Sequence, residues 1–207
     1  MQDINQLERE YKDFVYSRLN SGKEDNALLW LPDYNSLCIE SKDAHRDIAD
    51  KRFISQGLDG FIGESYEYLE ALERSKDDED IIFELGDVLF YVNVLSFSKD
   101  FRNRLVNIYE RANPATHRFH NFELNNPVQL LTPKLFKLVE LKKKLLYQEK
   151  THLKYEICLE VIELLGAYFK LYYSRVYNIS YEALYMQVIK CNIDKLNKRY
   201  PEGFKRR

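Results

Sequence analysis

Apolar side chains recur along this sequence at intervals of three and four residues, the spacing that puts them on one face of a helix. The stripe over residues 4–19 is formed by Leu7, Tyr11, Phe14, Val15 and Leu19. A charged helix is predicted over residues 41–56, leading to Gly57, and two helices within 58–96 are joined by a turn at 74–80. Further helices are predicted over 133–147, 155–173 and 181–199. The pattern therefore predicts an all-α fold.

The composition agrees with one helical globule. The 207 residues are 45% hydrophobic and 31% charged, with only 7 glycines and 5 prolines, a profile that argues against disorder. We therefore expect residues 1–207 to form a single all-α domain. The net charge is −2 with acids and bases interspersed, so no basic field favours nucleic acid as a partner. No apolar run is long enough to cross a membrane. The three cysteines lie far apart in the sequence, which suits reduced thiols in a cytoplasmic protein.

Two pairs of acids stand out in the first half of the chain. Glu64 and Glu67 form the first pair, and Glu84 and Asp87 form the second. Because each pair has i, i+3 spacing, each projects from one side of its helix. The helix that carries the second pair is apolar almost all round, over residues 81–95. A helix of that kind is normally buried.

Carboxylates on a buried helix need a compensating charge, because burying an unpaired carboxylate costs several kcal/mol. The helix of Glu64 and Glu67 offers no basic partner near them. Four carboxylates that converge between two helices therefore predict a hard divalent cation bound through oxygen, and Mg²⁺ suits such ligands. The alternative is two surface helices with solvated acids, above all for Glu64 and Glu67, whose helix has a polar side.

The spacing of these acids resembles that of a known enzyme family. An E-x-x-E pair is followed after 16 residues by E-x-x-D, with GE before the first pair and ELGDVLFYV around the second. Near the end of the chain, NIDKLNKRYPEGF (Asn192–Phe204) is similar to an N-x-x-K-x-x-x-R-x-P segment. The two segments together resemble the MazG-type all-α nucleoside triphosphate pyrophosphohydrolases, over less than half of the chain. The resemblance implies an all-α helical bundle of the MazG-like type.

The resemblance also implies an activity and a set of residues. The activity is the Mg²⁺-dependent hydrolysis of a nucleoside triphosphate, NTP or dNTP, between its α- and β-phosphates to give a monophosphate and pyrophosphate. The expected metal ligands and catalytic residues are Glu64, Glu67, Glu84 and Asp87. The expected substrate-binding residues, which share one face of the last predicted helix, are Asn192, Lys195 and Arg199. A basic helix end that complements the helix dipole would also explain that face.

A gap-free shift of 76 residues aligns the acidic helix pair with residues 133–174. The shift places Glu64 on Glu140, Glu67 on Lys143, Glu84 on Glu160 and Asp87 on Glu163. We interpret this segment as a degenerate copy of the helix pair, which would make the chain a fused pseudo-dimer. If the segment is instead an insertion, the chain leaves room for a homodimer or a tetramer. A chance match between two amphipathic hairpins is the remaining alternative.

Three other functions fit the sequence less well. A dedicated dUTP or dCTP pyrophosphatase shares the chemistry, and the sequence does not place the polar groups that discriminate between bases. A non-catalytic nucleotide-binding or regulatory helical protein would not need all four acids. A plain helical interaction module would leave the acids of the buried helix unexplained.

Overall fold

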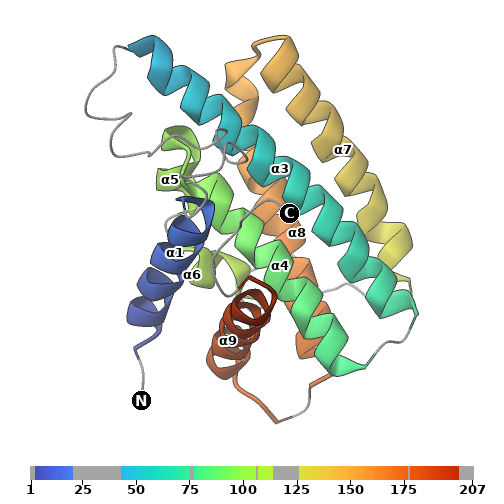
Figure 1. The fold of residues 1–207 in the computed structure, drawn as a ribbon. Coiled ribbons are helices and arrows are strands. Elements are labelled where there is room, and N and C mark those ends of the chain that lie inside the picture. The colour runs from blue at the N-terminus through green and yellow to red at the C-terminus, as the bar shows by residue number, and fades with distance from the viewer. Residues whose placement is uncertain are drawn as a thin grey trace.

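The computed structural model describes residues 3–20, 43–74, 77–105, 107–113, 126–176 and 178–200. Every regular element within these ranges is helical (Figure 1), so the predicted all-α fold is confirmed. The elements are α1 (Ile4–Asn20), α3 (Asp43–Glu73), α4 (Asp78–Ser96), α5 (Lys99–Leu105), α6 (Ile108–Ala112), α7 (Pro127–Tyr147), the short 3-10 helix η3 (Thr151–Leu153), α8 (Lys154–Tyr173) and α9 (Tyr181–Arg199). Among the helices that the structure describes, none has the length and apolar character needed to cross a membrane.

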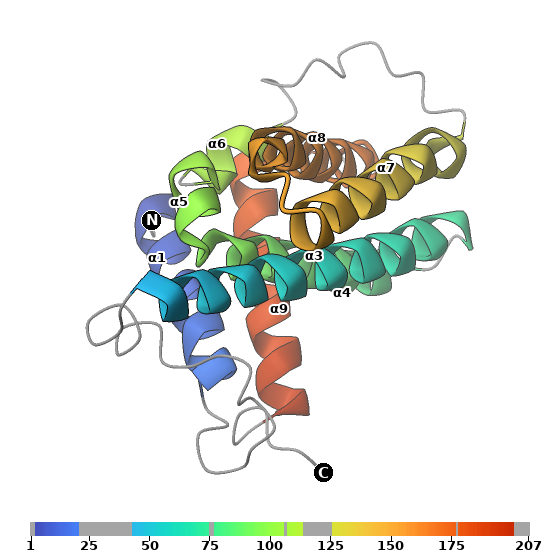
Figure 2. The same cartoon turned by 90° about the horizontal axis from the view of Figure 1, so that it is seen from above.

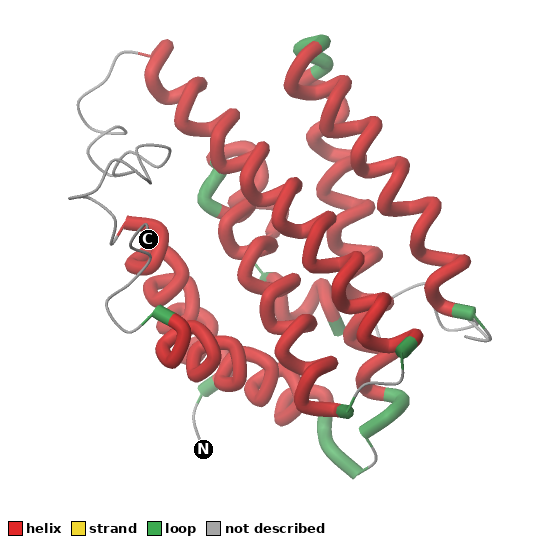
Figure 3. The backbone as a smooth tube through the Cα atoms, turned by 45° about the vertical axis from the view of Figure 1, so that its right-hand side comes forward, coloured by secondary structure: helices red, strands yellow, loops and turns green. Residues whose placement is uncertain are grey.

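Four long helices form two hairpins that lie side by side (Figures 1 and 3). One hairpin consists of α3 and α4, the other of α7 and α8, and α3 packs on α7 while α4 packs on α8. Figure 2 shows α9 and α1 running across the first hairpin. Both of these helices contact α4, and they also contact each other. Helix α4 therefore packs against α1, α3, α5, α8 and α9.

The burial of α4 follows from its sequence. The sequence predicted a buried helix, and most of its residues are indeed buried, from Ile81 in the second turn to Ser96 at the end. Its exposed start carries acids instead. Asp77 caps the helix by accepting a hydrogen bond from the backbone N–H of Asp80 at 2.8 Å. The acids of the first turn also complement the positive end of the helix dipole.

Glycines set how closely α4 is approached by its neighbours. A Cβ atom at Gly60 of α3 would lie 2.1 Å from the ring of Tyr91, and one at Gly86 of α4 would lie 2.8 Å from Cβ of Asn192. Real Cβ atoms do not make contacts this short, so only glycine fits at these positions. The consequence is that α3 packs directly over Tyr91 and that α9 approaches α4 closely at Asn192.

Two predicted helix boundaries were wrong, for reasons visible in the packing. The sequence suggested that a helix ends near Gly57, whereas α3 continues through it. A Cβ atom at Gly57 would lie 2.8 Å from Cβ of Leu95, so this glycine serves close packing and not a helix end. Helix α7 begins at Pro127, capped by the side chain of Asn126, rather than at Pro133, which lies inside it.

The close approach at Gly86 gives a prediction about stability. Gly86→Ala should lower the free energy of unfolding by about 1–3 kcal/mol, because α4 and α9 must move apart to accept the methyl group. Gly63→Ala is the matched control: Gly63 is also helical, but nothing lies within 4 Å of its added Cβ. The control should stabilise the protein by about 0.5–1 kcal/mol through helix propensity. Urea unfolding followed by circular dichroism measures both, and equal effects of the two substitutions would contradict the packing described here.

Candidate metal centre

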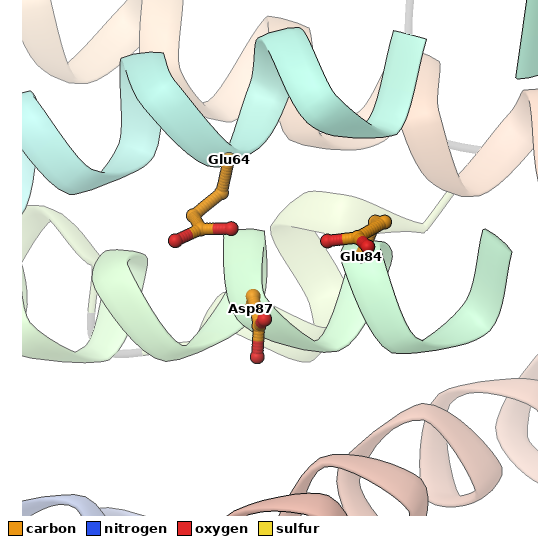
Figure 4. A group of neighbouring side chains, drawn as sticks. All are labelled: Glu64, Glu84 and Asp87. Atoms are coloured by element: carbon orange, nitrogen blue, oxygen red, sulfur yellow. The ribbon is translucent and has the colours of Figure 1, made fainter. Parts of the chain in front are cut away.

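Three of the four predicted acids come together between α3 and α4. Glu64, Glu84 and Asp87 each offer a carboxylate oxygen, and these oxygens all lie within 4.8 Å of one another. Figure 4 shows Glu64 reaching from α3 toward α4, which carries the other two. All three side chains are partly buried. The two helices thus bring three like charges into one partly desolvated group, which we call the carboxylate cluster.

Asp87 is held from the opposite side by α9. The side-chain amide of Asn192 donates a hydrogen bond from Nδ2 to Oδ1 of Asp87 at 2.7 Å. The ammonium group of Lys195, one turn later, forms a salt bridge with Oδ2 of the same carboxylate. Each carboxylate oxygen has more than one acceptor site, so Asp87 can still offer an oxygen to an ion. The last helix therefore fixes the position of one member of the cluster.

The hydrogen bond from Asn192 is itself supported by α1. The hydroxyl of Tyr11 donates to Oδ1 of Asn192 at 2.7 Å. Tyr11 is 1% exposed and Asn192 is fully buried. A short chain of hydrogen bonds therefore runs from α1 through α9 to Asp87 on α4. The close approach permitted by Gly86 brings the Asn192 amide within reach of that carboxylate.

The surroundings of the cluster raise the pKa of Glu64. Its pKa is raised from 4.5 to about 7, first by burial and then by the charges of Asp87, Glu67 and Glu84, against a smaller opposing effect of Lys195. The pKa of Tyr91 is raised to about 12 by burial and by its acidic neighbours, Glu64 foremost. Ionisation of Glu64 is therefore disfavoured relative to an ordinary glutamate unless a cation joins the cluster.

Glu67, Arg199 and Asn192, the other predicted site residues, differ in how far they are exposed. Glu67 is exposed and does not join the other three acids, so the structure brings together three of the four predicted carboxylates. Arg199 is exposed at the end of α9. Asn192 has no exposed surface, and both ends of its amide are occupied by Tyr11 and Asp87. The part of the terminal motif after Tyr200 lies outside the described residues.

The donor set fits a hard divalent cation. Carboxylate oxygens are the ligands that Mg²⁺ and Ca²⁺ prefer. The three carboxylates lie together, and the Lys195 ammonium forms a salt bridge with one of them, Asp87. A divalent cation in the cluster would favour the ionised form of Glu64, as expected for a carboxylate beside a positive charge. The residues present are therefore suitable for Mg²⁺, held by Glu64, Glu84 and Asp87.

The comparison with protein families bears on the same helices. Residues 55–112 match the family model of the MazG nucleotide pyrophosphohydrolase domain. This match confirms the resemblance over the segment that carries all three acids of the cluster. It spans well under half of the chain and does not reach α1, α7, α8 or α9, so the similarity of residues 192–204 to a MazG motif stays a prediction. No curated protein and no solved structure gives a significant match.

In the hairpin formed by α7 and α8, two acids of α8 form salt bridges with lysines of α7. Glu160 on α8 is 7% exposed and forms salt bridges with Lys134 at 3.3 Å and Lys137 at 2.5 Å, both on α7. Lys134 also pairs with Glu163 at 2.8 Å. The shift of 76 residues that aligns the hairpins places these lysines on Leu58 and Phe61, which are fully buried. The acids of α8 therefore have lysine partners on α7, and the aligned positions of α3 carry no cation.

The sequence did not predict how three residues, Tyr11, Gly86 and Lys195, shape the cluster. Tyr11 fell on the apolar stripe of the first helix, where a tyrosine looks like any other core residue. Lys195 was expected to bind phosphate, and its salt bridge with Asp87 joins residues more than 100 positions apart. Gly86 lies beside Asp87 in the motif, but its packing against Asn192 requires knowledge of where α9 crosses.

The raised pKa of Glu64 gives a prediction about stability against pH. Because the folded-state value of about 7 lies above the ordinary value of 4.5, the folded protein binds this proton more tightly than the unfolded chain does. Without divalent ions, the free energy of unfolding should therefore fall as the pH rises from about 5 to about 8. The contribution is about 1–2 kcal/mol when solvent screening at a partly buried site is taken into account.

Glu64→Gln is the control for this effect, since glutamine has no titrating proton. As the pH rises over this range, the unfolding free energy of the parent should fall relative to that of the Glu64→Gln variant. Urea unfolding of both proteins in the presence of a chelator measures this difference. A difference that stays constant or grows with pH would contradict the assignment.

Proposed function

We propose that this protein is a Mg²⁺-dependent nucleoside triphosphate pyrophosphohydrolase, which converts an NTP or dNTP and water into the monophosphate and pyrophosphate. The observation that carries the proposal is the convergence of Glu64, Glu84 and Asp87 from two helices within 4.8 Å. Their segment also lies within the match to the MazG nucleotide pyrophosphohydrolase domain. A metal centre and a nucleotide substrate are thus supported by independent observations.

The charges of the cluster explain why a metal ion is needed. A nucleoside triphosphate is an anion, and a group of carboxylates repels it. Mg²⁺ held by Glu64, Glu84 and Asp87 would supply the charge that draws in the phosphates, lowers the pKa of a bound water and stabilises the leaving pyrophosphate. Glu67, one turn from Glu64 and exposed, remains a candidate for contact with the same ion or its water.

Groups on α9 would complete the binding of the phosphates. An ammonium group has three N–H donors, and the Asp87 carboxylate accepts from Lys195, so donors remain for a phosphate oxygen. Arg199 lies one further turn along the same face, and its exposed guanidinium can bind phosphate through two parallel hydrogen bonds. Asn192 acts through Asp87 in this proposal and does not contact the substrate.

The reaction itself is a displacement at the α-phosphorus. A water oxygen forms a bond to this phosphorus while the bond to the oxygen bridging the α- and β-phosphates breaks. The electron pair of that bond leaves with pyrophosphate. A carboxylate of the cluster accepts the proton of the attacking water, which is general base catalysis.

The direct test is the release of pyrophosphate from a panel of ribo- and deoxynucleoside triphosphates with Mg²⁺. The parent should release pyrophosphate and monophosphate from at least one of them. Glu84→Gln should lower kcat by about 100-fold or more, because it removes a metal ligand from the cluster. Asp80→Asn is the matched control, since Asp80 lies one turn earlier on α4 and is exposed, and it should retain activity within about threefold.

Two outcomes would contradict the proposed function. One is the absence of pyrophosphate release from every nucleotide of the panel, which would favour a protein that binds nucleotides without hydrolysing them. The other is equal release by the parent and by Glu84→Gln, which would mean that the activity does not depend on the cluster.

A further inference from the structure

We infer that Tyr11 is a positioning residue of the metal centre, whose hydroxyl orients Asn192 and through it Asp87. The inference rests on the proposed function, because it gives a role at the same carboxylate cluster to a residue of α1. Helix α1 lies outside the segment that matches the MazG domain. Nothing in the acidic motif itself identifies this residue.

The direction of each hydrogen bond carries the argument. Asp87, when ionised, can only accept hydrogen bonds, so the NH₂ end of the Asn192 amide must face it. The oxygen end of the amide then points the other way, where the Tyr11 hydroxyl donates to it at 2.7 Å. The three groups therefore satisfy one another in only one orientation, with Nδ2 of Asn192 at 2.7 Å from Oδ1 of Asp87.

Burial makes this orientation costly to lose. Asn192 is fully buried and Tyr11 is 1% exposed, so water does not replace a missing partner at low cost. Without the hydroxyl, Oδ1 of Asn192 becomes a buried acceptor that lacks a donor, which favours other positions of the amide. Any of these weakens the hydrogen bond to Asp87, while the salt bridge with Lys195 still restrains this carboxylate. Mutation of a residue that hydrogen-bonds to a metal ligand commonly lowers metal affinity by about 10- to 100-fold.

A second buried tyrosine provides the control. Tyr68 on α3 is fully buried, and its hydroxyl donates to the backbone carbonyl of Tyr168 at 2.8 Å. Tyr68→Phe therefore removes a hydroxyl of the same kind, with a similar hydrogen bond, without touching Asn192 or Asp87. Tyr11→Phe keeps the ring that packs beside Phe14. The two variants lose comparable structural interactions, and only one of them lies on the path to the cluster.

The experiment measures Mn²⁺ binding to the metal-free 207-residue protein by the electron paramagnetic resonance signal of free Mn²⁺. It is done at a temperature at which circular dichroism shows each variant folded. Tyr11→Phe should raise the Kd for Mn²⁺ about tenfold, whereas Tyr68→Phe should leave it within about twofold of the parent. In the background of Asn192→Ala, Tyr11→Phe should have no further effect on the Kd, because the residue through which it acts is gone.

Three results would overturn the inference, and they have different meanings. If the parent binds Mn²⁺ and Tyr11→Phe binds equally well, the role of Tyr11 is wrong while the metal centre stands. If Tyr68→Phe weakens binding as much as Tyr11→Phe, or if Tyr11→Phe acts equally in the Asn192→Ala background, the effect is general and not transmitted through Asn192. If the parent does not bind Mn²⁺, both this inference and the proposed function fail.

Discussion

The arrangement of this protein depends on how negative charge is accommodated beside the buried helix α4. Asp87 is part of a cluster with Glu64 and Glu84, and it is held by the Asn192 amide and the Lys195 ammonium of α9. Removing charged groups from water costs more than a single contact returns, so such groups persist only where several partners meet them. The crossing of α9 over α4, made close by Gly86, is what supplies these partners.

The two hairpins accommodate their partly buried carboxylates in different ways. On α8, Glu160 and Glu163 are neutralised within the hairpin by the lysines of α7. On α4, the carboxylates meet a further acid from α3, and Asp87 forms a salt bridge with Lys195 of α9. The second arrangement gathers three carboxylates at one place, as a metal centre requires and a purely structural ion pair does not. The prediction that 133–174 is a degenerate copy of the acidic helix pair stays a prediction.

The helices and the importance of the acids of α4 could be predicted from the sequence. The contacts between helices that are distant in the sequence could not. An apolar helix that carries Glu84 and Asp87 predicts by itself that the two acids need a partner. Periodicity did not decide between Glu64 and Glu67, because residues three apart differ by only about 60° around a helix. In the structure Glu64 joins Glu84 and Asp87, whereas Glu67 is exposed and is not part of that group. The roles of Tyr11 and Lys195 depend on where α1 and α9 cross, which no local pattern specifies.

The proposed function requires that the carboxylate cluster binds a metal ion directly. The most direct measurement is the crystal structure of the protein with Mn²⁺ and a non-hydrolysable nucleoside triphosphate, with the ion located by its anomalous scattering. The account predicts an ion coordinated by carboxylate oxygens of Glu64, Glu84 and Asp87 and by phosphate oxygens. An ion bound elsewhere, or a triphosphate bound away from these three residues, would contradict it.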